Sequence, residues 1–219
     1  MVESINRTNF ALQSTFIIMR NKDYLHDLSL IKNMMNRSSR FISLSGFSGV
    51  LAGSYALIGA WFANQYIVEF AQNGRYIHKT MNILWFIAIT VALFSILTAY
   101  ILTSRRAKKN GEKIWDVSTK NLLVAFLTPL ITGGIFGLLI LNHKYYGLIA
   151  PITLIFYGLA LINASKYTLG TVKYLGVSEV LVGLFATYYI GYGLQFWALG
   201  FGILHIVYGT IMYFQYERK

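Results

Sequence analysis

Six apolar runs constrain this chain more than any other feature of its sequence. They cover Phe41–Phe62, Met81–Thr103, Leu122–Leu141, Leu148–Ala164, Tyr174–Leu194 and Phe196–Phe214. An α-helix needs about twenty apolar residues to cross the hydrocarbon core of a bilayer. The runs are continuously apolar and too long for the alternating strands of a membrane β-barrel. The sequence therefore predicts an all-α, polytopic membrane protein with six transmembrane helices.

The composition agrees with a chain whose main solvent is lipid. Hydrophobic residues make up 56% of the 219 residues, and charged residues make up only 12%. Soluble domains carry roughly 25% charged residues. Cysteine is absent, which excludes disulfides, thiolate metal sites and a cysteine nucleophile. The polar N-terminus has no signal-peptide pattern, so we expect the chain to be mature from Met1.

The basic residues lie between the apolar runs and favour one side. Sixteen of the 19 Lys and Arg lie in the N-terminal segment, the second and fourth loops and the C-terminus. The first, third and fifth loops hold the other three, so the positive-inside rule predicts that both termini are cytoplasmic. Trp61, Trp85 and Trp197 fall at the outer ends of their runs, as interfacial anchors do. The basic loop RRAKKNGEKIWD is read as a topology signal, and no nucleic-acid binding is expected.

Three regions follow from this pattern: an N-terminal segment (1–40), the six-helix bundle (41–214) and a short cytoplasmic tail (215–219). In the N-terminal segment, Leu25, Leu28, Ile31 and Met35 recur at helical spacing with charges between them. This amphipathic helix either lies on the inner leaflet of the bilayer or docks a cytoplasmic protein partner. The sequence does not predict an oligomeric state.

A weak internal repeat links the odd-numbered runs. The first contains Leu51-Ala52-Gly53, the third Ile131-Thr132-Gly133 and the fifth Leu181-Val182-Gly183. The fourth and sixth runs share Ile-x-Tyr-Gly, at Ile155–Gly158 and Ile206–Gly209. A repeat of three hairpins is one interpretation, since transporters often contain repeats. Chance matches among the common residues of membrane helices are the other.

Glu179 is the main candidate for chemistry, because it lies inside the fifth run. Ionisable side chains at such depth are costly and usually face a partner within the bundle. Folding the last two runs about residue 194 places Glu179 level with Tyr208, which predicts a hydrogen bond between them. Three interpretations stay open: a structural pair, a proton or cation site, and a side chain that reaches toward water.

His205 lies near the middle of the sixth run. It is either a buried neutral imidazole, a proton relay with Glu179, or a haem ligand. No second histidine lies at a matching depth, so no haem or other cofactor is expected, and no metal site is expected either.

Polar and proline residues in the third and fourth runs complete the candidates. Asn163 and Ser165, together with Glu179 and Tyr208, are expected to line one inward-facing pocket. Pro129 and Pro151 are expected to break their helices and free backbone carbonyls, which nearby threonines would satisfy.

Three segments carry a resemblance to known sequences: RSSRFISLSGFSGVLAGSYALIGA, APITLIFYGLALINASKYTLG and GYGLQFWALGFGILHIVYGTIMY. They resemble a family of six-helix bacterial inner-membrane proteins without an established function. The resemblance implies a multi-pass protein of the bacterial cytoplasmic membrane, and it transfers no substrate, cofactor or catalytic residue.

The functional hypotheses follow from these features. No catalytic or phosphate-binding motif is present, which favours a non-enzymatic role. The leading hypothesis is a regulatory or scaffold protein that binds partners through its N-terminal helix. The alternative is a small-solute or ion-coupled transporter that uses Glu179 and His205. A membrane enzyme is the third.

Overall fold

The computed structural model describes residues 44–73, 77–111 and 114–218, and these ranges contain helices and turns but no strand. The predicted N-terminal helix lies outside the described residues. The helices are α2 (Gly46–Asn73), α3 (Ile77–Lys109), α4 (Val117–Asn142), η1 (Tyr146–Leu148), α5 (Ile149–Ala164), η2 (Ser165–Tyr167), α6 (Val172–Tyr188), α7 (Gly193–Trp197), η3 (Ala198–Leu204) and α8 (His205–Tyr216).

Among the described residues, five helical segments are long and apolar enough to cross a membrane: α2, α3, α4, the run η1–α5–η2 and the run α7–η3–α8. The remaining helix of the bundle, α6 (Val172–Tyr188), is shorter, with 17 residues. For the described residues, the prediction of a helical protein with several helices long and apolar enough to span a membrane is therefore confirmed.

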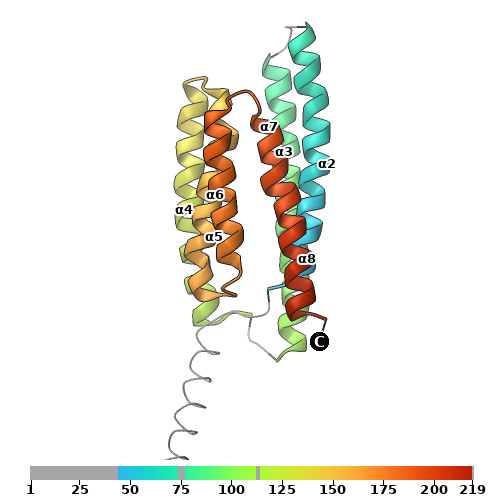
Figure 1. Ribbon diagram of the computed structural model, residues 1–219, viewed down its shortest axis with the longest axis vertical. Helices are drawn as coiled ribbons and strands as arrows, with labels where there is room; N and C mark the ends of the chain where they lie inside the picture. Colours follow the sequence, from blue (N-terminus) through green and yellow to red (C-terminus); the bar gives the residue numbers. More distant parts are fainter. Residues whose placement is uncertain (1–43, 74–76, 112–113, 219) are drawn as a thin grey trace, which may run out of the picture. The chain divides into compact units, whose positions relative to one another are not determined.

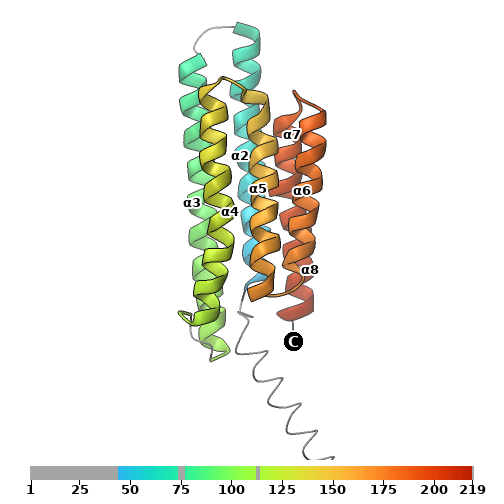
Figure 2. The ribbon, with the colours of Figure 1, turned by 90° about the vertical axis from the view of Figure 1, so that its left-hand side faces the viewer.

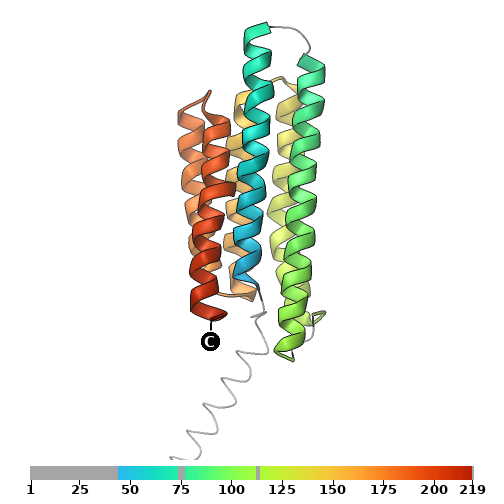
Figure 3. The ribbon, with the colours of Figure 1, turned by 90° about the vertical axis from the view of Figure 1, so that its right-hand side faces the viewer.

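The helices of the bundle form two layers of three (Figures 1 and 3). One layer has α2 between α3 and the α7–η3–α8 run, and the other has α5 between α4 and α6. Figure 2 shows the second layer from its outer side, with α4 and α5 in front. The layers contact each other mainly where α7 and η3 pack against α5 and α6. The chain thus enters the first layer, builds the second, and returns to the first with its last helix.

The helix ends differ from the predicted ends in two places. The first helix continues to Asn73, about three turns beyond its apolar run. The fifth predicted helix, which is α6, ends at Tyr188, six residues before its predicted end. The chain then turns through Tyr189–Tyr192. Gly191 has φ +110° in this turn, a conformation that residues with a Cβ rarely adopt. The earlier turn changes which residues of the last two helices lie level with each other.

Close glycine contacts join the helices within each layer. A Cβ on Gly158 of α5 would lie 2.6 Å from the carbonyl oxygen of Gly176 on α6. A Cβ on Gly209 of α8 would lie 2.6 Å from the carbonyl oxygen of Gly46 on α2. Backbones approach this closely in membrane proteins where small residues meet, because packing and not the hydrophobic effect holds the helices together.

The residues of the weak repeat make similar contacts in both of these helix pairs. Gly53 of α2 faces Ile206 of α8, and Gly183 of α6 faces Ile155 of α5. The third motif differs, because Gly133 of α4 lies under the ring of Phe156. The pair of α2 and α8 and the pair of α6 and α5 thus share one kind of glycine–isoleucine contact. The three-hairpin repeat stays a prediction.

Arg106 forms hydrogen bonds that join three helices at the C-terminal end of the bundle, where α2 begins and α3 and α8 end. Its guanidinium lies 2.8 Å from Glu217 Oε1 and also donates to the carbonyl oxygens of Leu44 and Tyr216. The same carboxylate accepts from the backbone N–H of Gly46. A residue that the sequence pattern treats only as a topology signal therefore closes one end of a layer.

We expect Arg106→Ala to lower the free energy of unfolding by about 1 to 2 kcal/mol, since one half-buried carboxylate and two carbonyls lose their donor. Thermal unfolding in detergent measures this loss. Arg105→Ala is the matched control, because Arg105 is an exposed neighbour of the same charge. Equal unfolding temperatures for the two variants would contradict this role of Arg106.

Candidate functional site

Glu179 lies at the centre of the candidate site, because α6 turns its carboxylate into the bundle. The side chain is 0% exposed. Gly176 and Gly183 lie on the same face of α6, one turn to either side, and both are in close contact with α5. On the side toward the other layer, η3 packs against α6. The carboxylate is therefore enclosed by three helical segments.

Neither carboxylate oxygen of Glu179 has a hydrogen-bond partner within the described part of the chain. More than nine in ten buried polar groups in proteins are hydrogen-bonded, so each exception needs a physical explanation. The requirement is stronger in a bilayer, where an ionised side chain is costly and is normally paired. A carboxylate held this way has both oxygens available to a ligand.

His205 is the ionisable side chain next to Glu179. Its Nδ1 atom lies 3.3 Å from Glu179 Oε1 and 3.1 Å from the carbonyl oxygen of Gly200. Its Nε2 atom lies 2.8 Å from the hydroxyl of Tyr157. With its proton on Nδ1, the imidazole donates to Gly200 and accepts from Tyr157. Glu179 is then within ion-pair distance of the ring but receives no hydrogen bond from it.

A π-helical turn, η3, creates this arrangement between α7 and α8. Such turns insert extra residues into a helix and occur frequently at functional sites. Gly200 lies within the turn, and a Cβ there would lie 2.5 Å from Glu179 Oε2. The absence of a side chain at Gly200 therefore makes room for the carboxylate, while its carbonyl orients His205.

Aromatic rings cover the site beside His205. The ring centroid of Phe201 lies 5.0 Å from that of Tyr157, 5.9 Å from that of His205 and 5.0 Å from that of Trp197. These rings exclude water from the imidazole on that side. Glu179 and His205 thus lie side by side in a mostly apolar enclosure.

Tyr208 does not bond to Glu179, so the predicted hydrogen bond is wrong. Its hydroxyl lies 3.4 Å from Thr171 Oγ1, in the turn before α6. The turn at Tyr189–Tyr192 comes earlier than the predicted turn, and η3 adds residues to the last helix. Both changes move Tyr208 toward the C-terminal end and bring Gly200 and His205 level with Glu179.

Asn163 and Ser165 serve the backbone instead of a pocket around Glu179. Asn163 Nδ2 donates to the carbonyl oxygen of Ala125 on α4 at 2.8 Å, and Ser165 Oγ donates to the carbonyl oxygen of Ile162 in its own helix. The prediction that Asn163 and Ser165 line one pocket together with Glu179 and Tyr208 is therefore wrong.

The bond from Asn163 explains how α4 tolerates Pro129. Proline has no N–H, so the carbonyl four residues earlier, that of Ala125, loses its helical donor. The amide of Asn163 takes that place. The expected threonine compensation is wrong, since Thr128 bonds to Val124 and Thr132 bonds to Thr128.

Pro151 does not break a helix, contrary to the prediction. It is fully buried in the first turn of α5, which begins at Ile149. Backbone N–H groups in a first turn lack an intrahelical acceptor, so a proline there removes little. The preceding residues Tyr146–Leu148 form the short 3₁₀ helix η1.

Within the described residues, no three His, Cys, Asp or Glu side chains come together in a group that could hold a metal ion. An apolar groove of about 380 Å³ lies between α2 and α3, with Tyr55, Phe62, Tyr66 and Phe94 among its lining residues. None of the residues around Glu179 lines it.

The chain matches no protein-family model, no curated protein and no solved structure. The resemblance to six-helix inner-membrane proteins therefore stays a prediction. The function has to be argued from the site.

Sequence reasoning missed Tyr157, Gly200 and Phe201 as parts of the site. Tyr157 belongs to the Ile-x-Tyr-Gly motif, which was considered only as a repeat. Gly200 and Gly202 lie in the segment ALGFGIL, and two glycines so close in an apolar run are a signal for close packing. No sequence signal indicates the π-helical turn that aligns them.

Proposed function

We propose that this protein is a multi-pass membrane carrier in which movement of a small solute or ion is coupled to a proton on Glu179 and His205. The observation that carries the proposal is the fully buried carboxylate of Glu179, which has no hydrogen-bond partner among the described residues and lies 3.3 Å from His205. Intramembrane ionisable residues of this kind occur in proton relays and transport pathways.

A purely structural role for Glu179 explains the site less well. A side chain that only joins helices is expected to have both oxygens hydrogen-bonded, because an unsatisfied buried acceptor costs about 1 to 3 kcal/mol. A leucine would serve packing without that cost. A site that alternates between protonated and deprotonated forms needs a carboxylate, which explains why residue 179 is a glutamate.

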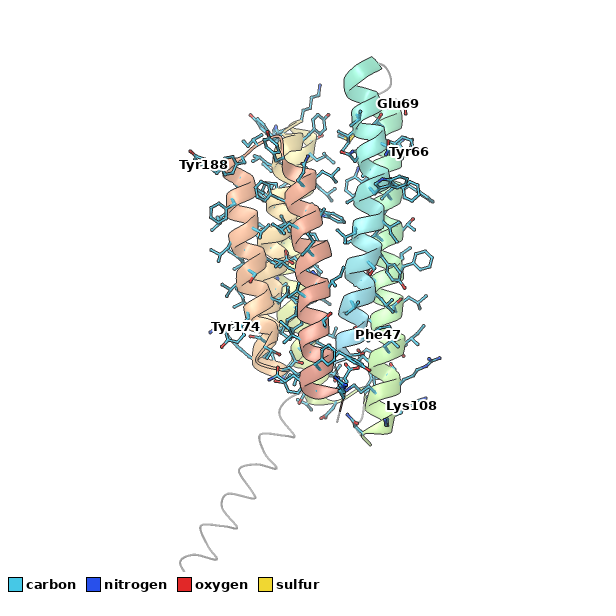
Figure 4. The ribbon with its side chains drawn as sticks, turned by 45° about the vertical axis from the view of Figure 1, so that its right-hand side comes forward. Phe47, Tyr66, Glu69, Lys108, Tyr174 and Tyr188 are labelled. Carbon is cyan, nitrogen blue, oxygen red and sulfur yellow. The ribbon has the colours of Figure 1, made fainter. Side chains whose placement is uncertain are left out.

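The proposal includes an orientation in the bacterial cytoplasmic membrane, with the C-terminal end of the bundle in the cytoplasm. Of the residues labelled in Figure 4, Lys108 lies at the C-terminal end, whereas Tyr66 and Glu69 lie toward the other end of α2. The charge count of the whole sequence supports the same orientation, since sixteen of the 19 basic residues belong to the termini and the second and fourth loops.

The regulatory or scaffold hypothesis is the second candidate. Its main support is the amphipathic pattern of residues 1–40, which lie outside the described residues. Deletion of residues 1–33 separates the hypotheses, because it should remove partner binding from a scaffold and leave the proton site of a carrier intact.

The test of the carrier is proton movement in proteoliposomes that contain a pH-sensitive dye. A potassium diffusion potential is applied alone and then with pools of amino acids, sugars, nucleosides, carboxylates and inorganic cations. We expect the wild-type protein to take up protons in at least one condition, and Glu179→Gln to lose about nine-tenths of that uptake or more.

Glu69→Gln is the matched control, since Glu69 is an exposed carboxylate near the C-terminal end of α2. This variant should keep the proton uptake of the wild type. Equal proton uptake by wild type and Glu179→Gln in every condition would refute the carrier.

A further inference from the structure

The ring of His205 has a different kind of neighbour at each of its two nitrogen atoms. Nδ1 lies 3.1 Å from the carbonyl oxygen of Gly200 and 3.3 Å from Glu179 Oε1. A backbone carbonyl can only accept a hydrogen bond, so Nδ1 carries a hydrogen in this arrangement. Nε2 lies 2.8 Å from the hydroxyl of Tyr157, a group that can both donate and accept. The two nitrogens therefore differ in whether their surroundings allow a change of protonation.

The π-helical turn η3 fixes the Nδ1 side of the ring. The backbone N–H of His205 donates to the carbonyl oxygen of Gly202, whereas the side chain donates to the carbonyl oxygen of Gly200. Loss of the hydrogen from Nδ1 would bring a nitrogen lone pair against this carbonyl and the nearby carboxylate oxygen of Glu179. Nδ1 thus keeps its hydrogen whether the imidazole is neutral or charged.

The hydroxyl of Tyr157 suits both charge states of the ring at Nε2. It donates to Nε2 of a neutral imidazole, and after rotation it accepts from the N–H of an imidazolium. The ring of Tyr157 itself is held by two others, since its centroid lies 5.9 Å from that of Phe126 on α4 and 5.0 Å from that of Phe201 on η3. Only the hydroxyl hydrogen has to move, and Tyr157 keeps its own proton in both states.

Glu179 supplies the charge that balances an imidazolium. Its Oε1 atom is within ion-pair distance of the ring. Among the described residues, Glu179 of α6 and Tyr157 of α5 are the titratable side chains in contact with the ring. On α2 the residue at this level is Gly49, where a Cβ would lie 3.5 Å from the His205 carbonyl oxygen. Uptake of one proton at Nε2 thus converts a negatively charged pair into a neutral ion pair, which is less costly in a bilayer.

We infer that this pair gains and loses its proton at Nε2 of His205, and that Tyr157 is a positioning residue that bonds to Nε2 in both charge states. The inference rests on the proposed function and names the atom of the site that exchanges the proton. Glu179 stays ionised as the counter-charge, and its replacement by glutamine removes the charge that stabilises the imidazolium.

The exchanging atom is identified by nitrogen NMR of isotope-labelled histidine in the full chain, reconstituted in lipid bilayers. The signals that His205→Gln removes belong to His205. Spectra are recorded between about pH 5 and about pH 9, around the range in which histidine titrates. We expect Nδ1 to carry a hydrogen throughout, and Nε2 to change from an unprotonated to a protonated nitrogen as the pH falls.

A neutral ring with its hydrogen on Nε2, or a proton gained at Nδ1, would overturn the inference. Ring nitrogens of His205 that do not change over this range would overturn it as well. The proposed function is decided separately by proton uptake in proteoliposomes. A loss of uptake in Glu179→Gln together with any of these spectra would leave the carrier in place and remove only the assignment to Nε2.

Tyr157→Phe tests the positioning role, because it removes the hydroxyl and keeps the ring between Phe126 and Phe201. We expect the signal of unprotonated Nε2 to move to that of a nitrogen without a hydrogen bond, while the Nδ1 signal stays. Proton uptake should fall about tenfold, since the imidazolium loses its acceptor at Nε2 and hydrogen bonds from charged donors are the stronger ones.

Tyr213→Phe is the control for this variant. Tyr213 is an exposed tyrosine about two turns beyond His205 on the last helix, and its loss of a hydroxyl should leave both the spectra and the proton uptake as in the wild type. An unchanged Nε2 signal in Tyr157→Phe, or proton uptake equal to that of Tyr213→Phe, would overturn the positioning role of Tyr157.

Discussion

Replacement of Gly158 by alanine is expected to lower the free energy of unfolding by about 3 kcal/mol, although alanine favours helices. The new Cβ would lie 2.6 Å from the Gly176 carbonyl oxygen and 2.9 Å from the backbone nitrogen of Val180. Both are backbone atoms, so α5 and α6 must move apart to accept the methyl group. The separation also removes part of the cover over Glu179.

Gly134→Ala is the matched control for this loss. Gly134 lies on α4, which is also long and apolar enough to cross a membrane, and a Cβ there meets nothing within 4 Å. It should be neutral or stabilise α4 slightly, because glycine costs roughly 1 kcal/mol relative to alanine inside a helix. Unfolding in detergent with increasing denaturant measures both variants. A Gly158→Ala protein as stable as Gly134→Ala would show that the α5–α6 contact is looser than described.

Asn163→Leu is expected to cost about 2 to 3 kcal/mol of stability, because it leaves the Ala125 carbonyl without a donor in an apolar environment. The side chains are similar in volume, so the loss comes mainly from the hydrogen bond. The consequence should be local to α4 and α5, and it should depend on Pro129.

A double-mutant cycle with Pro129→Ala tests this dependence. Alanine at residue 129 restores the backbone N–H that bonds to the Ala125 carbonyl within the helix. Asn163→Leu should therefore cost little in the Pro129→Ala background. Equal costs in both backgrounds would contradict the assignment of Asn163 as the partner of the carbonyl that Pro129 frees.

Polar residues in this bundle have two candidate roles, stabilising the fold and binding a proton. The residues assigned to these roles differ in how many of their polar atoms have hydrogen-bond partners. Asn163 and Arg106 meet backbone carbonyls at short distance, and their removal is expected to affect stability. Glu179 has no hydrogen-bond partner in the part of the chain that the structure describes, and its removal is expected to affect proton uptake. Measurements of folding and of proton uptake should therefore separate the two groups of variants.

The helices and the burial of Glu179 can be predicted from the amino-acid sequence. A bilayer requires an apolar residue at nearly every position of a spanning helix, so the spans can be read one residue at a time from the chain. The same requirement makes a glutamate inside a run conspicuous.

Which polar groups meet depends on the tertiary packing of the helices. The predicted partner of Glu179 was Tyr208, and the structure places His205 and Gly200 there. Each residue of a helix adds about 100° of rotation and 1.5 Å of rise, so a shifted turn and a π-helical segment exchange one set of neighbours for another. The bonds of Asn163 to Ala125 and of Arg106 to Glu217 join residues far apart in the chain, where no local pattern in the sequence relates the two partners.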